Sequence, residues 1–193
     1  QLSARLSSNV EAFPRYVYYG ENLIAIMIIF ETPRLIIRQF TKNDLQHFFD
    51  LNGNEEVVRY IRPAVNREEA EKSLLWNIAF YASHPNLGRW AVIEKATNTF
   101  AGSFALIPIE QEKEKLQIGY ALLPQFWGMG YASELVHFGK PFFFEHHFQD
   151  ILYAVTEQPN LASQQVLLKS GFKLVGNMME GSKILIRFKF HRP

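Results

Sequence analysis

Residues 116–139, LQIGYALLPQFWGMGYASELVHFG, decide the fold, because a strand-like run leads there through a glycine-containing turn into a helix-like run. A helix N-terminus leaves about four backbone N–H groups without partners and carries the positive end of the helix dipole. Gly128 and Gly130 let a ligand come close to that backbone. The stretch therefore predicts a diphosphate site that needs no cationic side chain.

The same stretch resembles the acetyl-coenzyme A signature of the GNAT acetyltransferase superfamily, Gln/Arg-x-x-Gly-x-Gly/Ala. Trp127, Gly130 and Ala132 occupy its positions. Trp127 replaces the usual Gln or Arg, and Trp-Gly-x-Gly-Tyr-Ala resembles the branch that contains the RimJ/RimL-type N-terminal acetyltransferases of ribosomal proteins.

Two further blocks extend the resemblance to about residues 31–190. Residues 160–172, NLASQQVLLKSGF, resemble the family's Asn-x-x-Ser block, in which a short helix ends in Gly-Phe. Residues 31–40, ETPRLIIRQF, resemble its first strand. Blocks in the right order are a stronger signal than any one of them alone.

The length and composition of the chain favour a single domain. The chain has 193 residues, of which 48% are hydrophobic, and domains commonly run to about 100–200 residues. The chain begins with Gln1, and family-like sequence starts after Met27. We therefore set residues 1–26 apart as an extension of uncertain origin and expect residues 27–193 to form a single domain.

Charge and cysteine content exclude several classes of function. With 20 Lys and Arg against 19 Asp and Glu, no global basic field exists for nucleic acid or an anionic membrane. The longest apolar run, residues 23–30, is far shorter than the roughly 20 residues that span a bilayer. The lack of cysteine excludes disulfides and an acyl-cysteine intermediate. We expect a cytoplasmic monomer or homodimer with no metal, nucleic-acid or membrane partner.

Periodicity and turn residues predict the order β α α β β β α β α β β. The expected strands are 34–40, 90–94, 99–109, 116–123, 151–156, 172–175 and 183–190, and the expected helices are 41–51, 67–83, 130–144 and 161–169. Pro141 should kink or shorten the third helix. This order fits an α/β (α+β type) protein with a mixed, mostly antiparallel sheet of six to seven strands and helices on both faces. The resemblance identifies it as the GNAT fold.

The resemblance implies where acetyl-CoA binds. The diphosphate would contact main-chain N–H groups of Trp127, Gly128, Met129, Gly130, Tyr131 and Ala132. A bulge in the fourth strand would free N–H groups toward the thioester and the pantetheine arm, which assigns that role to Tyr120, Ala121, Leu122 and Leu123. Trp127 could instead serve mainly as a packing anchor.

The second block supplies the predicted catalytic residues. By the same resemblance, Asn160 bonds the pantetheine arm or a substrate backbone, and it also suits a helix N-cap. Ser163 would lie near the coenzyme sulfur and help to protonate it. Glu157, just beyond the fifth expected strand, is the first candidate for the general base.

Two positions depart from the family pattern. Leu167 stands where many members carry an acidic Tyr, so Ser163, Tyr131 through water, or solvent must supply the proton. Gln117 stands where relatives often carry Glu, so a base is missing there. These departures keep open a non-catalytic acyl-CoA-binding module.

The expected reaction is transfer of an acetyl group from acetyl-CoA to a primary amine by direct attack in a ternary complex. A protein or peptide N-terminal α-amine is the favoured acceptor, with a small amine, polyamine or aminoglycoside as alternatives. A dinucleotide-binding enzyme is the main competitor, because Gly128-x-Gly130 follows a strand and Glu157 ends the next one. Ser133 in place of a third glycine counts against it.

Overall fold

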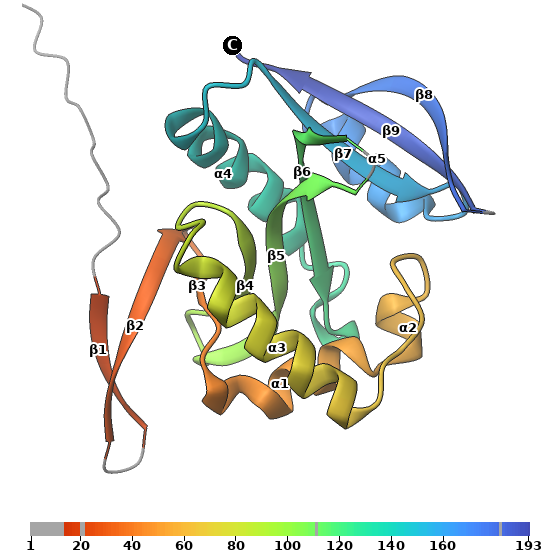
Figure 1. The fold of residues 1–193 in the computed structure, drawn as a ribbon. Helices are drawn as coiled ribbons and strands as arrows, with labels where there is room; N and C mark the ends of the chain where they lie inside the picture. The colour runs from red at the N-terminus through yellow and green to blue at the C-terminus, as the bar shows by residue number, and fades with distance from the viewer. Residues whose placement is uncertain (1–13, 20–21, 111, 182) are drawn as a thin grey trace, which may run out of the picture.

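The fold is one mixed sheet with helices on both faces (Figure 1). The computed structural model describes residues 14–19, 22–110, 112–181 and 183–193. The nine strands, in spatial order β1-β2-β3-β4-β5-β6-β7-β9-β8, are β1 Pro14–Tyr19, β2 Asn22–Glu31, β3 Leu35–Gln39, β4 Gly88–Glu94, β5 Thr99–Ile109, β6 Glu112–Leu122, β7 Ile151–Glu157, β8 Lys173–Glu180 and β9 Lys183–His191. The helices are α1 Leu45–Asn52, α2 Glu55–Val58, α3 Arg67–Tyr81, α4 Tyr131–His146 and α5 Leu161–Lys169, with 3-10 turns at Lys42–Asp44 and Pro124–Phe126.

The predicted fold class and order of elements are confirmed from β3 to the end of the chain. The structure adds α2 and an antiparallel hairpin, β1 and β2, which extends the sheet beyond β3. The boundary placed between residues 26 and 27 falls inside β2.

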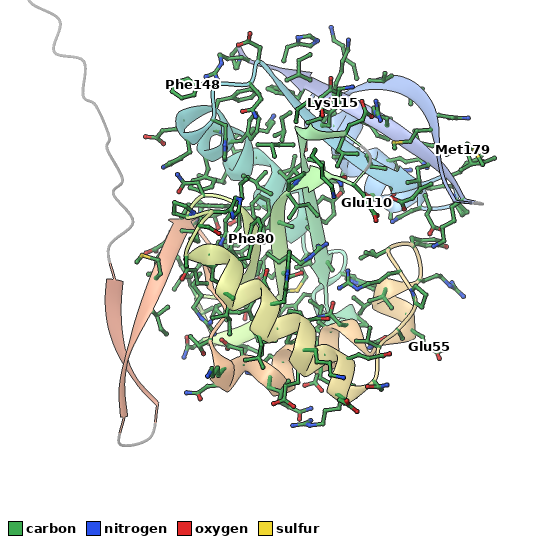
Figure 2. The ribbon with its side chains drawn as sticks, viewed as in Figure 1. Glu55, Phe80, Glu110, Lys115, Phe148 and Met179 are labelled. Carbon is green, nitrogen blue, oxygen red and sulfur yellow. The ribbon has the colours of Figure 1, made fainter. Side chains whose placement is uncertain are left out.

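Each face of the sheet has its own hydrophobic core, because strand residues alternate between faces. In β4, Trp90 and Val92 join the core under α4 and α5, whereas Ala91 and Ile93 join the core under α1 and α3. At the outside of the molecule, the exposed side chains of Glu55 and Met179 point away from the body (Figure 2).

The strands β6 and β7 form the only parallel pair among the described strands, and they part almost at once. Their register contains Gln117↔Tyr153 and Ile118↔Ala154 and nothing beyond. After Ile118, β6 keeps its pairing with β5, while β7 continues its pairing with β9. The sheet therefore opens into a fork, and about every second backbone N–H on the free side of β6 loses its strand partner.

The helix α4 continues through Pro141 to His146, so Pro141 does not shorten it, while the alternative that Pro141 kinks the helix stays a prediction. Proline removes one internal N–H, but Phe142 and Phe143 just after it are buried in the core. Their burial stabilises the last turn of the helix, since each large apolar side chain contributes about 1.5–3 kcal/mol.

A buried ion pair fixes the start of the α1 segment. Arg38 on β3 binds Asp44 through two hydrogen bonds of 2.7 and 2.8 Å, and both side chains are at most 5% exposed. Asp44 also accepts from the backbone N–H of Thr41 at 2.7 Å. Burial acts to raise the pKa of Asp44, but the hydrogen bonds and charge of Arg38 outweigh it and hold this pKa below its ordinary value.

Asp44→Asn should lower the free energy of unfolding at pH 7 by about 3–5 kcal/mol, because it removes the negative charge that compensates the buried Arg38. A carboxyl whose pKa is depressed by folding contributes stability above its unfolded-state pKa and loses it as the pH falls through the folded value. The difference between the two proteins should therefore narrow below about pH 4. Urea unfolding of both proteins at pH 7 and near pH 3.5 measures this difference in the free energy of unfolding.

The matched control is Glu68→Gln, which breaks the exposed pair between Lys72 and Glu68. That variant should unfold like the parent protein. A difference for Asp44→Asn that stays constant with pH would show that its carboxylate charge is not the cause.

Candidate active site

The turn before α4 presents a row of backbone donors. Gly128 and Gly130 have φ angles of 74° and 80°, and Gly130 is the N-cap of α4. Such left-handed glycines turn successive N–H groups toward one concave surface, which binds anions. No acceptor within the described residues is bonded to the N–H groups of Gly128, Met129, Gly130, Tyr131, Ala132 and Ser133. Ser133 was not among the predicted donors, because only its position in the first helical turn leaves its N–H without an acceptor.

The prediction that the backbone N–H groups of Trp127 and Leu123 are free to bind the cofactor is wrong. Trp127 donates its N–H to Pro124 O at 3.0 Å, and Leu123 donates to Ala101 O at 2.9 Å. The Trp127 indole donates to Leu122 O at 2.7 Å. Trp127 therefore braces the turn on the end of β6, and the free backbone donors begin at Gly128.

An ion pair holds the turn in place from the other side. Arg34 and Glu134 are 2.6 Å apart, and a second nitrogen of Arg34 donates to Met129 O at 2.9 Å. Thr32 donates to Glu134 at 2.5 Å. Burial acts to raise the pKa of Glu134, but the bonds from Thr32 and Arg34 outweigh it and keep this pKa below its ordinary value. The first turn of α4 is thus fixed to the chain between β2 and β3.

The expected bulge in β6 is absent from its pairing with β5. The register runs without a shift from Leu116 to Leu122, and the one irregularity lies at Pro108 and Ile109. Leu123 donates to Ala101 on β5, and strand N–H groups alternate in direction, so the N–H of Ala121 also faces β5. The predicted free donor at Ala121 is therefore wrong, whereas the N–H groups of Tyr120 and Leu122 face the side that β7 leaves.

The structure brings Ser163 against the hydroxyl of Tyr120, a contact that the sequence did not predict. Tyr120 Oη on β6 lies 3.0 Å from Ser163 Oγ on α5. Burial raises the pKa of Tyr120 to about 12. The pair therefore stays protonated at neutral pH and acts as a hydrogen-bond donor.

Asn160 and Glu157 lie in the same turn between β7 and α5. The Asn160 side chain accepts from Ser163 N at 3.1 Å, which confirms the N-cap, while its Nδ2 donates to nothing in the described chain. Glu157 pairs with Lys183. The role of Glu157 as general base stays a prediction.

Neither Leu167 nor Tyr131 has a side chain that could act as the general acid. Leu167 is 2% exposed and belongs to the core under α4 and α5, which explains an apolar residue there. Tyr131 is 3% exposed and donates its hydroxyl to Glu94. Tyr131 is therefore unavailable as an acid, whereas its backbone N–H remains free.

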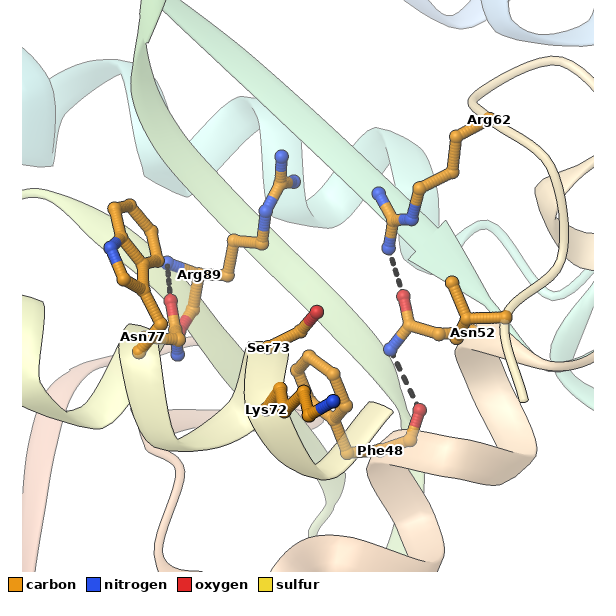
Figure 3. A pocket seen from close by; sticks show the side chains of 9 residues that line it. Phe48, Asn52, Arg62, Lys72, Ser73, Asn77 and Arg89 are labelled. Carbon is orange, nitrogen blue, oxygen red and sulfur yellow. Dashed lines mark hydrogen bonds between the residues drawn. The ribbon is translucent and has the colours of Figure 1, made fainter. Parts of the chain in front are cut away.

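The opposite face of the sheet carries a cavity of about 400 Å³ between α1, α3 and β4 (Figure 3). Its lining combines apolar side chains with three cationic ones and consists of Phe48, Asn52, Arg62, Val65, Lys72, Ser73, Trp76, Asn77 and Arg89. Composition gave no sign of this local basic patch, because the whole chain is nearly neutral.

The described residues contain no group of three or more His, Cys, Asp or Glu placed to hold a metal ion. Among these residues, no helix is both long and apolar enough to cross a membrane.

A family model described as an acetyltransferase (GNAT) domain matches residues 34–173. The chain belongs to the GNAT family. It is an acetyl-CoA-dependent N-acetyltransferase, and the antiparallel majority of its sheet excludes the dinucleotide-binding alternative. Its similarity to the uncharacterized N-acetyltransferase YoaA of Bacillus subtilis (strain 168) is 31% identity over 150 residues, covering 77% of this chain and 84% of YoaA.

Solved structures share the fold of this GNAT chain. One is RimL, a ribosomal-protein alpha-N-protein acetyltransferase in complex with coenzyme A, with a TM-score of 0.72, 18% identity and coverage of 85% of this chain and 97% of RimL. Another is spermidine N-acetyltransferase from Vibrio cholerae, in complex with CoA and spermine, with a TM-score of 0.66, 19% identity and coverage of 81% and 95%.

Gly128→Ala should weaken coenzyme A binding by about tenfold or more, because a side chain at this φ favours rotation of the free N–H groups away from the ligand. No atom lies within 4 Å of the added Cβ, so the fold itself has room. Gly181→Ala is the matched control: its φ is 59°, its Cβ also meets nothing within 4 Å, and it lies between β8 and β9.

Both variants should lose similar stability, and only Gly128→Ala should lose affinity in calorimetry. Equal coenzyme affinities in the two variants would place the diphosphate away from this turn.

Proposed function

We propose that this GNAT enzyme acetylates the N-terminal α-amine of a protein or peptide. The observation that carries the proposal is the arrangement at the fork: free N–H groups before α4, the open side of β6, and Ser163 with Asn160 at the start of α5. These groups suit an acetyl-CoA whose diphosphate lies on the α4 turn and whose pantetheine arm enters between β6 and β7. The similarity of the Trp127 turn to the RimJ/RimL branch supports the acceptor class.

The acceptor amine is proposed to enter from the face of α1 and α3. Helices α4 and α5 contribute to the core of the opposite face, and the coenzyme would occupy the fork beside them. The neutral amine nitrogen attacks the thioester carbon, the C–S bond breaks, the sulfur leaves as a thiolate, and the new amide nitrogen releases its extra proton to water. An α-amine has a pKa of about 8, so part of it is already neutral at pH 7.

Ser163, supported by Tyr120, would stabilise the departing thiolate by hydrogen bonding. A coenzyme thiol has a pKa of about 8.5, well below that of Tyr120 at about 12. Net proton transfer from the tyrosine is therefore unfavourable, and solvent supplies the proton after departure.

A polyamine is a poorer acceptor for this chain. The cavity on the α1–α3 face is lined by Arg62, Lys72 and Arg89 and by no carboxylate. A cationic chain would be repelled there, while a peptide N-terminus carries a single charge next to a polar backbone.

An acceptor panel tests the function by measuring coenzyme A release. Peptides with free N-termini should be acetylated with a kcat/KM well above that for spermidine or an aminoglycoside, and the same peptides with blocked N-termini should be inert. Faster transfer to spermidine would contradict the proposed acceptor class. Binding of acetyl-CoA without transfer to any amine would indicate a non-catalytic module.

Ser163→Ala should lower kcat by about tenfold or more and leave the affinity for acetyl-CoA nearly unchanged, because the lost bond acts on the leaving sulfur. Tyr120→Phe should lower kcat by a smaller factor. Neither change should move the pKa values of the pH–rate profile, since both hydroxyls remain protonated. Parent-like kinetics for Ser163→Ala would remove this serine from the mechanism.

A further inference from the structure

The cavity on the α1–α3 face contains two arginines that point into the same space from opposite sides (Figure 3). Arg62 lies in the segment after α2, and Arg89 lies on β4. Like charges repel, so such a pair is found where a third group compensates it.

Arg62 is held in position by the end of α1. Its guanidinium donates to the side-chain oxygen of Asn52, and Asn52 Nδ2 donates to Phe48 O at 2.7 Å. Asn52 is only 4% exposed. This chain of bonds orients Arg62 without neutralising its charge.

Arg89 has a fixed backbone and a free guanidinium. Its carbonyl accepts from Asn77 Nδ2 at 2.9 Å and from the hydroxyl of Tyr81, and its N–H donates to Asn77 Oδ1 at 3.2 Å. The guanidinium donates to no acceptor of the described chain. Burial, reinforced by the charge of Arg62, lowers the pKa of Arg89 to about 10, so the group remains a cation at neutral pH.

Among the described residues, no carboxylate lines the cavity to compensate these charges. Lys72 has its own exposed partner, Glu68, and Glu55 points away from the molecule (Figure 2). The buried Arg38, by contrast, is bound bidentately by Asp44. Arg62 and Arg89 are half-buried. Partly removing a cation from water without a counter-ion is costly, and an anionic ligand would lower that cost.

The register of the sheet places this cavity beside the fork. Arg89 pairs with Ala105, and Ala105 pairs with Gly119, so the three residues lie in one row on the same face. Adjacent strands are about 4.8 Å apart, which puts the Arg89 backbone about 10 Å from Gly119. Gly119 directly follows Ile118, where β7 leaves β6.

We propose that Arg62 and Arg89 bind a carboxylate of the acceptor, so that the preferred substrate is a peptide with Asp or Glu next to its N-terminal residue. A guanidinium pair matches carboxylate geometry. The distance of about 10 Å from the fork corresponds to a few extended backbone units. This inference rests on the proposed function, because it assumes that the amine enters from the same face.

The carboxylate site can be tested with three peptides that share an N-terminal alanine. They differ only at the second residue, which is Glu, Gln or Lys. The wild-type kcat/KM should be about tenfold or more higher for Glu than for Gln, and lowest for Lys. In Arg62→Met and Arg89→Met the ratio of Glu to Gln should fall toward one, while the value for the Gln peptide changes little. Arg89→Lys, which retains the charge, should keep part of the preference.

Arg59→Met is the matched control, since Arg59 is an exposed arginine at the end of α2 and does not line the cavity. It should keep the full preference for Glu. Thermal unfolding and acetyl-CoA affinity, measured for every variant, distinguish a lost carboxylate site from a damaged fold. If Arg89→Met fails to fold, Arg89→Lys is used in its place.

The outcomes distinguish the two proposals. Equal kcat/KM for the Glu and Gln peptides in the wild type, or a preference that survives both Met variants, would overturn the carboxylate site and leave the proposed function standing. Failure to acetylate any of the peptides would overturn both.

Discussion

The separation of β6 from β7 is the constraint on which the rest of the structure depends. Two parallel strands that pair only at Gln117↔Tyr153 and Ile118↔Ala154 must be held apart by other contacts. The core under α4 and α5 fills one side, and antiparallel pairing with β5 and β9 supports each strand from its outer edge. Unpaired main-chain groups inside a sheet are costly unless a ligand or water satisfies them. The fork is therefore both a structural defect and a place for an extended cosubstrate.

Charge is distributed differently on the two faces. On the α4 face, the charged side chains beside the glycine turn are bonded: Arg34 binds Glu134, and Glu94 accepts from Tyr131. The donors left there are neutral main-chain N–H groups, which suit a diphosphate by geometry and helix dipole. On the α1–α3 face, Arg38 is neutralised by Asp44, whereas Arg89 is not neutralised by any described residue. A nearly neutral chain thus contains one strongly local field, which a net charge cannot reveal.

Sequence reasoning predicted those features that depend on local chemistry. Glycines before a helix and the Asn160 N-cap are encoded by residues a few positions apart, and the structure contains both. The features it missed join distant segments. Tyr120 meets Ser163, and Arg34 meets Glu134, over separations of 43 and 100 residues. Trp127 shows the same limit in a small space, because its sequence position matched a cofactor signature while its indole and backbone bonds serve the turn.

The bond between Arg34 and Glu134 also has a consequence for how the enzyme is made. Chains leave the ribosome from the N-terminus, so Arg34 emerges long before the helix that it secures. Until Glu134 and the flanking strands have been synthesised, the glycine turn has no fixed conformation to offer the cosubstrate. A nascent chain therefore gains no stabilisation from acetyl-CoA until these segments have been synthesised, and the protection that ligand binding gives to a native state begins only then.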